Sequence, residues 1–428
     1  MSGHVLNRAR LPLLEAMFDV LIRHGKLTVI DAAGRQSSFG PGAPGPHVVI
    51  GLHRRWLPLR LALDPMLAVG EAYMDGTVTI EQGDVRDFLL LTSAGIEDVH
   101  RMRASGLFAR LQRLSARLVP ANDRRRSRRN VESHYELPPA FFDLFLDRDQ
   151  HYSCAYFRTG DEDLEAAQQA KVRHIMAKLL LRPGDQVLDI GCGWGALAVA
   201  IATKAGVAVQ GLTLSAAQLR IAEARARHQG AAGATRFALR DYRDETGPYD
   251  RIVSVGMLEH VGAQGFDTYF AKIAALLHDD GVAVIHSIGT SMAVSDTGSA
   301  SFTWLNRHVF PGGYIPALSE IVPAVERAGL WITDIEILRL HYADTLHCWW
   351  NRFATMRGAA QEMLGERFCR MWEFYLAACE AGFRNGRLMV FQLQLAKRID
   401  AVPRTRDYIA EAEQRLDMPA SPGRVRAA

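Results

Sequence analysis

The sequence predicts an α/β protein built on a doubly wound, mostly parallel sheet and preceded by a small α+β domain. Two observations carry this prediction. From residue 187 onward, short apolar runs alternate with helical patterns, which is typical of such sheets. At the first run, the segment VLDIGCGWG (Val187 to Gly195) places an acid and alternate glycines where a strand is expected to turn into a helix.

Composition narrows the class of protein. The chain has 428 residues, 48% of them hydrophobic and 23% charged, which allows two or three ordinary globular domains. A net charge of +3 is too small to indicate a nucleic-acid partner by itself. The five cysteines are scattered and never spaced CxxC, so we expect no disulfide framework, no metal site and a reducing, cytoplasmic compartment. No apolar run is long enough to span a bilayer, so we expect any membrane contact to be peripheral.

The N-terminal part has its own pattern. Leu11 to His24 place apolar residues on one helical face, and Lys26 to Glu81 contain the strand-like runs LTVI, HVVIGL and TVTI between Gly and Pro clusters. These patterns predict the small α+β domain. The expected organisation is an N-terminal domain (1–120), a basic linker (121–130), an α/β domain (131–400) and a C-terminal tail (401–428).

The boundary between the two domains is strongly basic. Arg110, Arg113 and Arg117 project from one face of a predicted helix, and RRRSRR follows at Arg124 to Arg129. Two interpretations stay open. The segment is either a solvated linker or a surface that binds anionic membranes. Nucleic acid is not expected, because no recognisable reading module accompanies the charge.

Seven strands are predicted for the larger domain, and polar residues follow several of them. The expected strands are 187–190, 207–212, 235–239, 250–255, 282–288, 332–340 and 388–396. Ligands of such sheets bind at the carboxyl ends of the strands. Thr213, Asp241, Glu259 and His286 fall at or near those ends, so we expect them to surround one crevice.

The glycine turn predicts a nucleotide-like cofactor. Gly191, Gly193 and Gly195 permit backbone torsions and close approaches that a Cβ would block, and Asp189 strengthens the interpretation as a site. A dinucleotide is the competing ligand, since the turn also satisfies GxGxxA. That interpretation requires an acid at the end of the next strand, and Val209 to Ser215 contains none.

With these positions assembled, the chain closely resembles the cyclopropane-fatty-acyl-phospholipid synthase family of S-adenosylmethionine-dependent methyltransferases, which includes the mycolic acid cyclopropane synthases. The resemblance covers nearly the whole chain and implies a class I methyltransferase sheet. GEAYMDG, at Gly70 to Gly76, resembles the family's extra domain, thought to approach lipid. The motifs that carry the resemblance, in family order, are YSCAYF (152–157), VLDIGCGWG, GLTLSAAQ (211–218), RDYRD (240–244), VSVGMLEHVG (253–262), HSIG (286–289) and FPGGYIP (310–316).

The resemblance implies a set of cofactor-binding residues. Gln218 would meet the ribose hydroxyls in place of the missing acid. An alternative stays open, because Ser215 and Gln218 also fit the S-x-x-Q capping box of the next helix. The residues expected to contact S-adenosylmethionine are Tyr152, Ser153, Asp189, Gly191, Gly193, Gly195, Thr213, Leu214, Gln218, Asp241 and Tyr242.

The same resemblance implies a bicarbonate site for proton removal. Taken singly, its residues have ordinary explanations, such as a buried structural cysteine. Together, at strand ends around one crevice, they favour catalysis. The expected catalytic residues are Cys154, Glu259, His286, the backbone of Ile288, and Tyr342.

The implied activity is methyl transfer to a cis double bond of a phospholipid acyl chain, followed by cyclopropane closure. One alternative is a methyltransferase that leaves a methyl branch, and another is a lipid-binding protein without activity. The expected partners are unsaturated phospholipid and an anionic membrane surface at the inner face of the membrane. The oligomeric state stays open, with a homodimer as one alternative.

Overall fold

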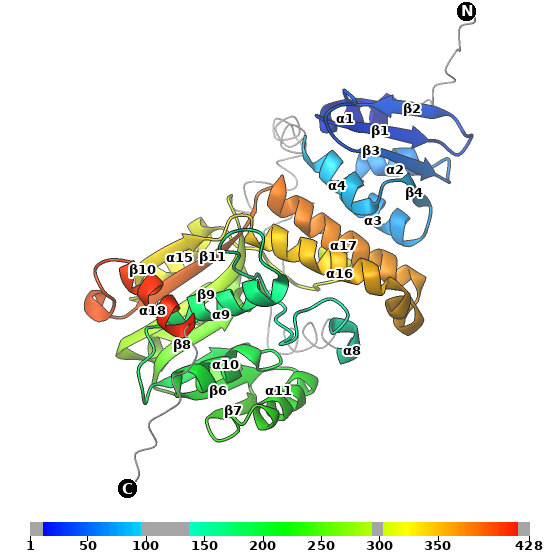
Figure 1. Cartoon of the computed structure of the whole chain (residues 1–428). Coiled ribbons are helices and arrows are strands. Elements are labelled where there is room, and N and C mark those ends of the chain that lie inside the picture. The colour runs from blue at the N-terminus through cyan, green and yellow to red at the C-terminus, as the bar shows by residue number, and fades with distance from the viewer. Residues whose placement is uncertain (1–11, 96–136, 293–302, 418–428) are drawn as a thin grey trace, which may run out of the picture.

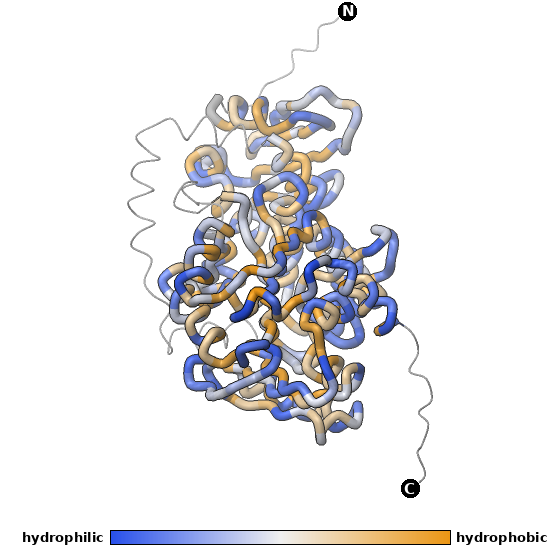
Figure 2. Tube along the Cα trace, turned by 90° about the vertical axis from the view of Figure 1, so that its left-hand side faces the viewer, coloured by the Kyte–Doolittle hydropathy of each residue, from blue (hydrophilic) through white to orange (hydrophobic). Residues whose placement is uncertain are grey.

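The computed structural model describes residues 12–95, 137–292 and 303–417, which form two sheets flanked by helices (Figure 1). The predicted basic segment, Arg110 to Arg129, lies outside these ranges. Within them, no helix has the length and apolarity needed to cross a membrane. Hydrophobic and hydrophilic positions alternate along the trace in Figure 2, as expected for a chain folded around internal cores.

The N-terminal sheet confirms the predicted α+β pattern. Its order is β2-β1-β3-β4, and β1 runs antiparallel to β2 and parallel to β3. Leu14 and Phe18 of the first helix are buried, as the amphipathic pattern predicts. The elements are α1 (Pro12–Leu21), β1 (Lys26–Ile30), β2 (Gln36–Phe39), β3 (His47–Leu52), α2 (Leu57–Leu63), α3 (Pro65–Met74), β4 (Val78–Gln82) and α4 (Val85–Ser93).

Three helices of this domain, α2, α3 and α4, were not predicted. α2 and α3 lie in the stretch where the sequence suggested only short strands. Pro65 begins α3, where its missing N–H costs nothing, and the Asp64 side chain caps the helix by accepting a hydrogen bond from the Leu67 N–H at 3.4 Å. The near-continuous apolar run hid the helical period, because α2 carries leucines on more than one face.

The larger sheet has seven strands in the order β10-β11-β9-β8-β5-β6-β7, which confirms the predicted doubly wound architecture. β5 lies parallel between β8 and β6, and the last strand, β11, inserts antiparallel between β9 and β10. The strands are β5 (Gln186–Ile190), β6 (Ala208–Thr213), β7 (Thr235–Leu239), β8 (Tyr249–Val255), β9 (Leu277–Thr290), β10 (Trp331–Ile337) and β11 (Leu388–Ala396).

Helices cover both faces of this sheet because successive strand residues point to opposite sides. Val187 of β5 packs in the cluster that contains residues of α9 and α10, while its neighbour Leu188 packs in the cluster on the other face. The helices are α8 (Pro139–Phe142), α9 (Leu164–Leu179), α10 (Ala196–Ala205), α11 (Ala216–His228), α12 (Phe266–Leu276), α14 (Thr303–His308) and α15 (Leu318–Arg327).

A long helical hairpin joins the two parts of the molecule. α16 (His341–Leu364) and α17 (Glu366–Arg384) pack against each other, and α17 also packs against α3 and α4 (Figure 1). Arg86 of α4 donates two hydrogen bonds to the buried Glu380 carboxylate, at 2.6 and 2.8 Å. Residues 407–417 of the predicted C-terminal tail form α18 (Asp407–Asp417), which packs on α9.

Candidate active site

The glycine turn forms the floor of a cavity of about 430 Å³ at the carboxyl edge of the sheet. Gly191, Gly193 and Gly195 have φ values of 81°, 54° and 79°, a region that favours glycine. The N–H groups of Gly191 and Cys192 donate to the Leu212 carbonyl oxygen at 3.0 and 2.9 Å. These bonds fix the turn against the end of β6.

Most of the residues predicted to bind the cofactor line this cavity. They come from the loop before α9 and from the ends of β5, β6 and β7. Gly195 is not among them: a Cβ on it would lie 2.8 Å from the Ala222 Cβ, so this glycine permits α11 to approach the turn. The lining residues predicted from the sequence are Tyr152, Ser153, Asp189, Gly191, Gly193, Thr213, Leu214, Gln218, Asp241 and Tyr242.

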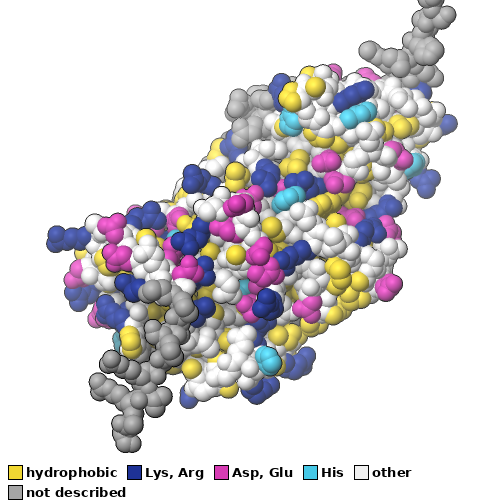
Figure 3. All heavy atoms as spheres, viewed as in Figure 1, with side chains coloured by type: hydrophobic (Ala, Val, Ile, Leu, Met, Phe, Trp, Pro, Cys, Tyr) yellow, Lys and Arg dark blue, Asp and Glu magenta, His cyan; other side chains and the backbone are white. Residues whose placement is uncertain are grey.

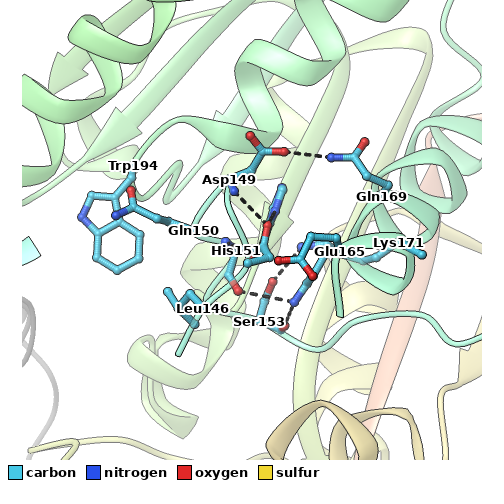
Figure 4. Close-up of polar contacts among 12 residues, drawn as sticks. Leu146, Asp149, Gln150, His151, Ser153, Glu165, Gln169, Lys171 and Trp194 are labelled. Atoms are coloured by element: carbon cyan, nitrogen blue, oxygen red, sulfur yellow. Dashed lines mark hydrogen bonds and ion pairs between the residues drawn. The ribbon is translucent and has the colours of Figure 1, made fainter. Parts of the chain in front are cut away.

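One buried cation in the cavity wall was missed by the sequence analysis. Lys171, on α9, is 1% exposed, and its Nζ donates to the Ser153 Oγ at 3.0 Å (Figure 4). Burial lowers the pKa of Lys171 to about 8, although Asp147 nearby opposes the shift. The buried residues of α9 also include Gln168, His174 and Lys178, so the sequence offered no signal that distinguished Lys171. Only the fold shows that this face meets the cofactor cavity.

The cavity also contains a buried acid without a hydrogen-bond partner on one oxygen. Asp189 is 2% exposed, and its Oδ2 has no partner among the described residues. Burial raises the pKa of Asp189 to about 7, even though the charge of Lys171 acts in the opposite direction. Asp189 and Lys171 therefore give the cavity an acceptor and a donor, which suit the ammonium and carboxylate ends of an amino-acid moiety.

The structure bears on the two interpretations of Gln218. The Ser215 Oγ accepts from the Gln218 N–H at 3.2 Å, which is one half of a capping box. The other half is missing, because the Gln218 Oε1 accepts from the Thr213 hydroxyl at 2.8 Å, and the Ser215 N–H donates to the Thr213 Oγ1 instead. Gln218 thus lines the cavity with its amide nitrogen unbonded to other described residues, as a ligand role requires.

The loop that carries Tyr152 and Ser153 is held by a compact set of polar side chains (Figure 4). Asp147, Asp149 and His151 bring possible metal-ligand atoms within 4.8 Å of one another. However, Asp147 accepts hydrogen bonds from the backbone N–H groups of Asp149 and His151, and Gln169 donates to Asp149 at 2.8 Å. These bonds shape the loop, so we interpret the cluster as structural.

A second cavity, of about 120 Å³, adjoins the first and shares Tyr152, Ser153, Gly256 and His260 with it. The structure brings all of the predicted catalytic residues to its wall, although they come from four distant segments. Cys154 follows the shared loop, Glu259 lies on the short helix η2 (Leu258–His260), and Tyr342 lies on α16. The catalytic residues that line this cavity are Cys154, Glu259, His286, Ile288 and Tyr342.

The Glu259 carboxyl group is buried, and only one of its two oxygens has a hydrogen-bond partner among the described residues. It is 8% exposed, and its Oε1 accepts from the Ile288 N–H at 2.6 Å, while its Oε2 has no partner among the described residues. Burial raises the pKa of Glu259 to about 7, and the bond from Ile288 opposes the shift. The Ile288 N–H therefore orients Glu259 in this structure. One acceptor oxygen of Glu259 is left for a ligand with a hydroxyl group.

His286 and Tyr342 provide donors on the other walls. The Gln392 amide nitrogen donates to the His286 Nδ1 at 3.2 Å, and burial lowers the pKa of His286 to about 3. The imidazole is therefore neutral, with its proton on Nε2, because Nδ1 is the acceptor. Burial raises the pKa of Tyr342 well above its usual value, so its hydroxyl stays protonated.

Apart from Asn306 and the residues shared with the first cavity, the rest of the second cavity is apolar and aromatic. These positions were not predicted, because isolated Leu and Phe residues on α14 and α17 read as ordinary core. Tyr375 lies with its hydroxyl 3.0 Å from that of Tyr152, at the junction of the two cavities. The additional lining residues include Leu305, Phe310, Ile315, Tyr375, Phe383 and Leu388.

The strand order, the glycine turn and the cavity at the carboxyl edge define the class of protein: an α/β methyltransferase fold that binds a nucleotide-like cofactor. Comparison with known families agrees. Residues 122–393 match the family model described as mycolic acid cyclopropane synthetase. The chain belongs to this family of S-adenosylmethionine-dependent methyltransferases.

Individual relatives support the assignment. The cyclopropane-fatty-acyl-phospholipid synthase of Escherichia coli (strain K12) is 35% identical over 80% of this chain and 86% of its own length. The tuberculostearic acid methyltransferase UfaA1 of Mycobacterium tuberculosis is 37% identical over 65% of this chain and 67% of its own. The crystal structure of the mycolic acid cyclopropane synthase CmaA1, complexed with SAH and CTAB, has a TM-score of 0.60 and 34% identity, and covers 63% of this chain and 97% of CmaA1.

Proposed function

We propose that this protein transfers the methyl group of S-adenosylmethionine to a cis double bond of an unsaturated phospholipid acyl chain and then closes a cyclopropane ring. The observation that carries the proposal is the pair of adjoining cavities. One is lined by the predicted cofactor residues, and the other by the predicted catalytic residues within apolar walls. The Escherichia coli relative, named for a phospholipid substrate, supports the substrate class.

The chemistry explains why the second cavity is apolar. S-adenosylmethionine supplies an electrophilic methyl group, and bicarbonate supplies a general base. An alkene that gains a methyl group becomes a cation, and loss of one proton from that methyl lets its electron pair close the ring. The chain must align the alkene and exclude water that would trap the cation. Tyr342 lines this cavity and can offer its aromatic face to positive charge, while Trp349 packs edge to face against Tyr342, with 5.8 Å between the ring centroids, and is not part of the cavity wall.

The second cavity also has the groups that a bicarbonate requires. The unpartnered Oε2 of Glu259 would accept a hydrogen bond from its hydroxyl. The Nε2–H of His286 and the hydroxyl of Tyr342 would donate to its other oxygens. Cys154, whose thiol pKa is raised by burial, stays neutral and so adds no repulsive charge. Within this proposal, Glu259 sets the orientation of the anion.

A direct assay tests the proposed activity. The protein is incubated with S-adenosylmethionine, bicarbonate and vesicles of unsaturated phospholipid, and the released fatty acids are analysed by mass spectrometry and proton NMR. We expect products one methylene heavier, with the upfield proton signals of a cyclopropane. Unchanged acyl chains together with methylation of a soluble small molecule would overturn the substrate assignment.

A methyl branch is the second candidate product, and the similarity to UfaA1, a methyltransferase by name, is the observation that favours it. Both reactions begin with the same methyl transfer and differ in the fate of the cation. The NMR analysis separates them, because only ring closure gives cyclopropane signals. A lipid-binding protein without activity would consume no S-adenosylmethionine at all.

We also propose that the enzyme acts as a peripheral protein at the inner, anionic face of the membrane, with the arginines of residues 110–129 contributing attraction. Surface attraction is screened over about 10 Å at 0.1 M salt. Activity on anionic vesicles should therefore fall as salt rises, with less effect on detergent-dispersed lipid. Vesicle sedimentation that is unchanged after replacement of the five arginines of Arg124 to Arg129 with glutamine would return this segment to the solvated-linker interpretation. A homodimer stays a prediction.

A further inference from the structure

His174 of α9 is a buried histidine with a carboxylate at each of its ring nitrogens. The residue is 3% exposed. Its Nε2 lies 2.7 Å from the Glu336 carboxylate on β10, and its Nδ1 lies 2.5 Å from the Glu413 carboxylate on α18. An ionised carboxylate only accepts hydrogen bonds, so each ring nitrogen must carry a proton. These contacts therefore require His174 to be a charged imidazolium.

The charges around His174 balance only when it is protonated. Three carboxylates, from β10 and α18, face two other cations, from α9 and from the residue before α18. Although burial opposes the charge, hydrogen bonds to the Glu336 and Glu413 carboxylates raise the pKa of His174. Loss of the proton would leave Glu413 without a cation, because its ion pair within the described residues is with His174. The other charged groups of the cluster are Lys178, Asp334 and Arg406.

The contact with His174 is also the better shielded of the ion pairs that hold α18 on α9 (Figure 1). The pair from Asp417 to Arg173, at 3.3 Å, involves a carboxylate that is 47% exposed, whereas the Glu413 side chain is 17% exposed. Solvent screens exposed pairs, and Figure 3 shows acidic and basic side chains interspersed in that exposed way over the middle of the molecule. α18 lies beyond residues 122–393, which match the family model, so this contact is an addition to the family's common domain.

The second neighbour of His174 is an aromatic ring. Tyr156 lies between His174 and His341, with ring centroids 4.3 and 4.8 Å apart and interplanar angles of 15° and 14°. The Phe157 N–H donates to the His341 Nδ1 at 3.0 Å, so that nitrogen carries no proton. A cation over the face of Tyr156 is attracted by the ring quadrupole, and a neutral imidazole is not. The charge on His174 therefore helps to hold the Tyr156 ring in place.

This stack leads directly to two residues of the second cavity. Tyr156 is two residues after Cys154 in the chain, and His341 is the residue before Tyr342 on α16. Cys154 and Tyr342 both line the second cavity. A change in the charge of His174 thus reaches the cavity wall through one aromatic ring.

We propose that His174 is a positioning residue for the second cavity, that it acts as an imidazolium, and that α18 keeps it charged through Glu413. The pKa of His174 is raised above its ordinary value of 6.5, so the contribution is complete below that value and is lost as pH rises through the pKa of the folded protein. The expected effect on turnover rests on the proposed function. The charge itself and its effect on local structure do not.

Proton NMR of the imidazole Cε1–H groups measures the charge directly. The His174 resonance is identified by its absence from His174→Gln, and we expect it to titrate at higher pH than an ordinary histidine, whose pKa is about 6.5. In Glu413→Gln it should titrate at lower pH than in wild type, since one of the two carboxylates is gone. Glu411→Gln is the matched control, because Glu411 is 65% exposed and pairs with Arg415 of the same helix. It should titrate like wild type.

Hydrogen exchange measures the positioning without any substrate. The N–H groups of Ala155 and Phe157 each donate to a side chain of α16 at 3.0 Å. At about pH 6, their protection should fall by about 3- to 30-fold in His174→Gln, the factor that a cation–π contact represents, and stay unchanged in Glu411→Gln. The kcat should fall by a similar factor while cofactor affinity stays within about twofold of wild type.

The variant Glu413→Gln keeps the proposal testable if His174→Gln does not fold, because Glu413 is at the surface end of the cluster. In wild type, kcat and the protection of the two amides should fall as pH rises through the His174 midpoint. In Glu413→Gln the same fall should occur at lower pH, together with the NMR titration. A merely structural contact would not move these pH profiles.

Three outcomes would overturn the proposal. The first is a wild-type His174 that titrates at or below about pH 6.5. The second is an equal shift of the titration in Glu411→Gln and Glu413→Gln. The third is unchanged amide protection in folded His174→Gln or, at every pH, in Glu413→Gln. Failure of the proposed function would appear separately, as wild type with the expected titration and amide protection that leaves unsaturated acyl chains unchanged.

Discussion

The two cavities of the active site are adjoining but are built in different ways. The cofactor cavity is formed largely by short motifs at the ends of neighbouring parallel strands, starting from the glycine turn. The second cavity is assembled from residues 154, 259, 286–288 and 342, which meet only through the sheet and α16. The first holds charged and hydrogen-bonding groups that suit a cofactor, while the second holds an under-bonded acid in apolar surroundings. Under the proposed function, cofactor binding and proton removal should therefore be open to independent damage.

The strongest test of this separation is Gly193→Val. Gly193 has φ 54° and lines the cofactor cavity, and its Cβ would meet no atom within 4 Å, so the new side chain would occupy ligand space without disturbing the core. We expect a loss of S-adenosylmethionine affinity of more than about 100-fold, since backbone approach is blocked. Isothermal calorimetry measures it.

Gly206→Val is the matched control. Gly206 has φ 65°, also meets nothing within 4 Å, and caps α10 away from the cavity. Both variants carry the same backbone penalty, of about 1–2 kcal/mol. Equal cofactor affinity in the two variants would show that the turn does not contact the ligand.

The second test changes a residue of the second cavity, Glu259. Glu259→Gln keeps the shape of the side chain but removes the carboxylate that would orient the proposed bicarbonate, so kcat should fall by up to the about 10²- to 10⁴-fold that a general base contributes. Cofactor affinity should stay within about twofold of wild type. Calorimetry and turnover measured on the same preparation separate the two effects. A parallel loss of cofactor binding would remove Glu259 from the proton-accepting site.

The third test compares the unfolding free energies of wild type and Glu259→Gln as a function of pH. Burial raises the pKa of Glu259 from 4.5 to about 7, so the folded protein binds this proton more tightly than the unfolded chain. The stability that this proton contributes is fully present below the pKa of Glu259 in the unfolded chain. It is lost as pH rises through the pKa of about 7 in the folded protein. Relative to wild type, Glu259→Gln should therefore gain up to about 3 kcal/mol between pH 4.5 and pH 8. Denaturant unfolding across this range measures it, and a constant difference would contradict it.

The smallest effects are expected from two substitutions in the first turn of α11. They distinguish the helix-capping role of Ser215 from the proposed ligand role of Gln218. Gln218→Leu should lower cofactor affinity by about tenfold, since it removes the side chain that the resemblance assigns to the ribose hydroxyls. Ser215→Ala should leave affinity unchanged and cost about 1 kcal/mol of unfolding free energy, because it removes the helix cap. Binding and thermal unfolding measured on both variants provide the check. The reverse pattern would restore the capping interpretation of Gln218.

Local patterns were sufficient for much of the fold. Alternating strands and helices predicted all seven strands of the larger sheet, since the central strands contain buried apolar runs between turns, although the edge strands β7 and β10 are mostly not buried. The polar β2 and the helices α2, α3 and α4 were missed, and β2, α2 and α3 show no clear period. α18, within the predicted tail, owes its position to tertiary contacts, including the hydrogen bond between the Glu413 carboxylate and His174 at 2.5 Å.

The sequence by itself determined which chemical groups this protein has and, through its motifs, the family to which they belong. Only the tertiary structure decided what those groups do next to one another. It placed Lys171 in the cofactor wall, gave Gly195 a packing role, and directed the Ile288 N–H onto Glu259. The physical reason is range: torsional preferences and apolar periodicity act over a few residues. Burial, pKa shifts and shared cavities depend on side chains that lie far apart in the chain and meet only when it folds.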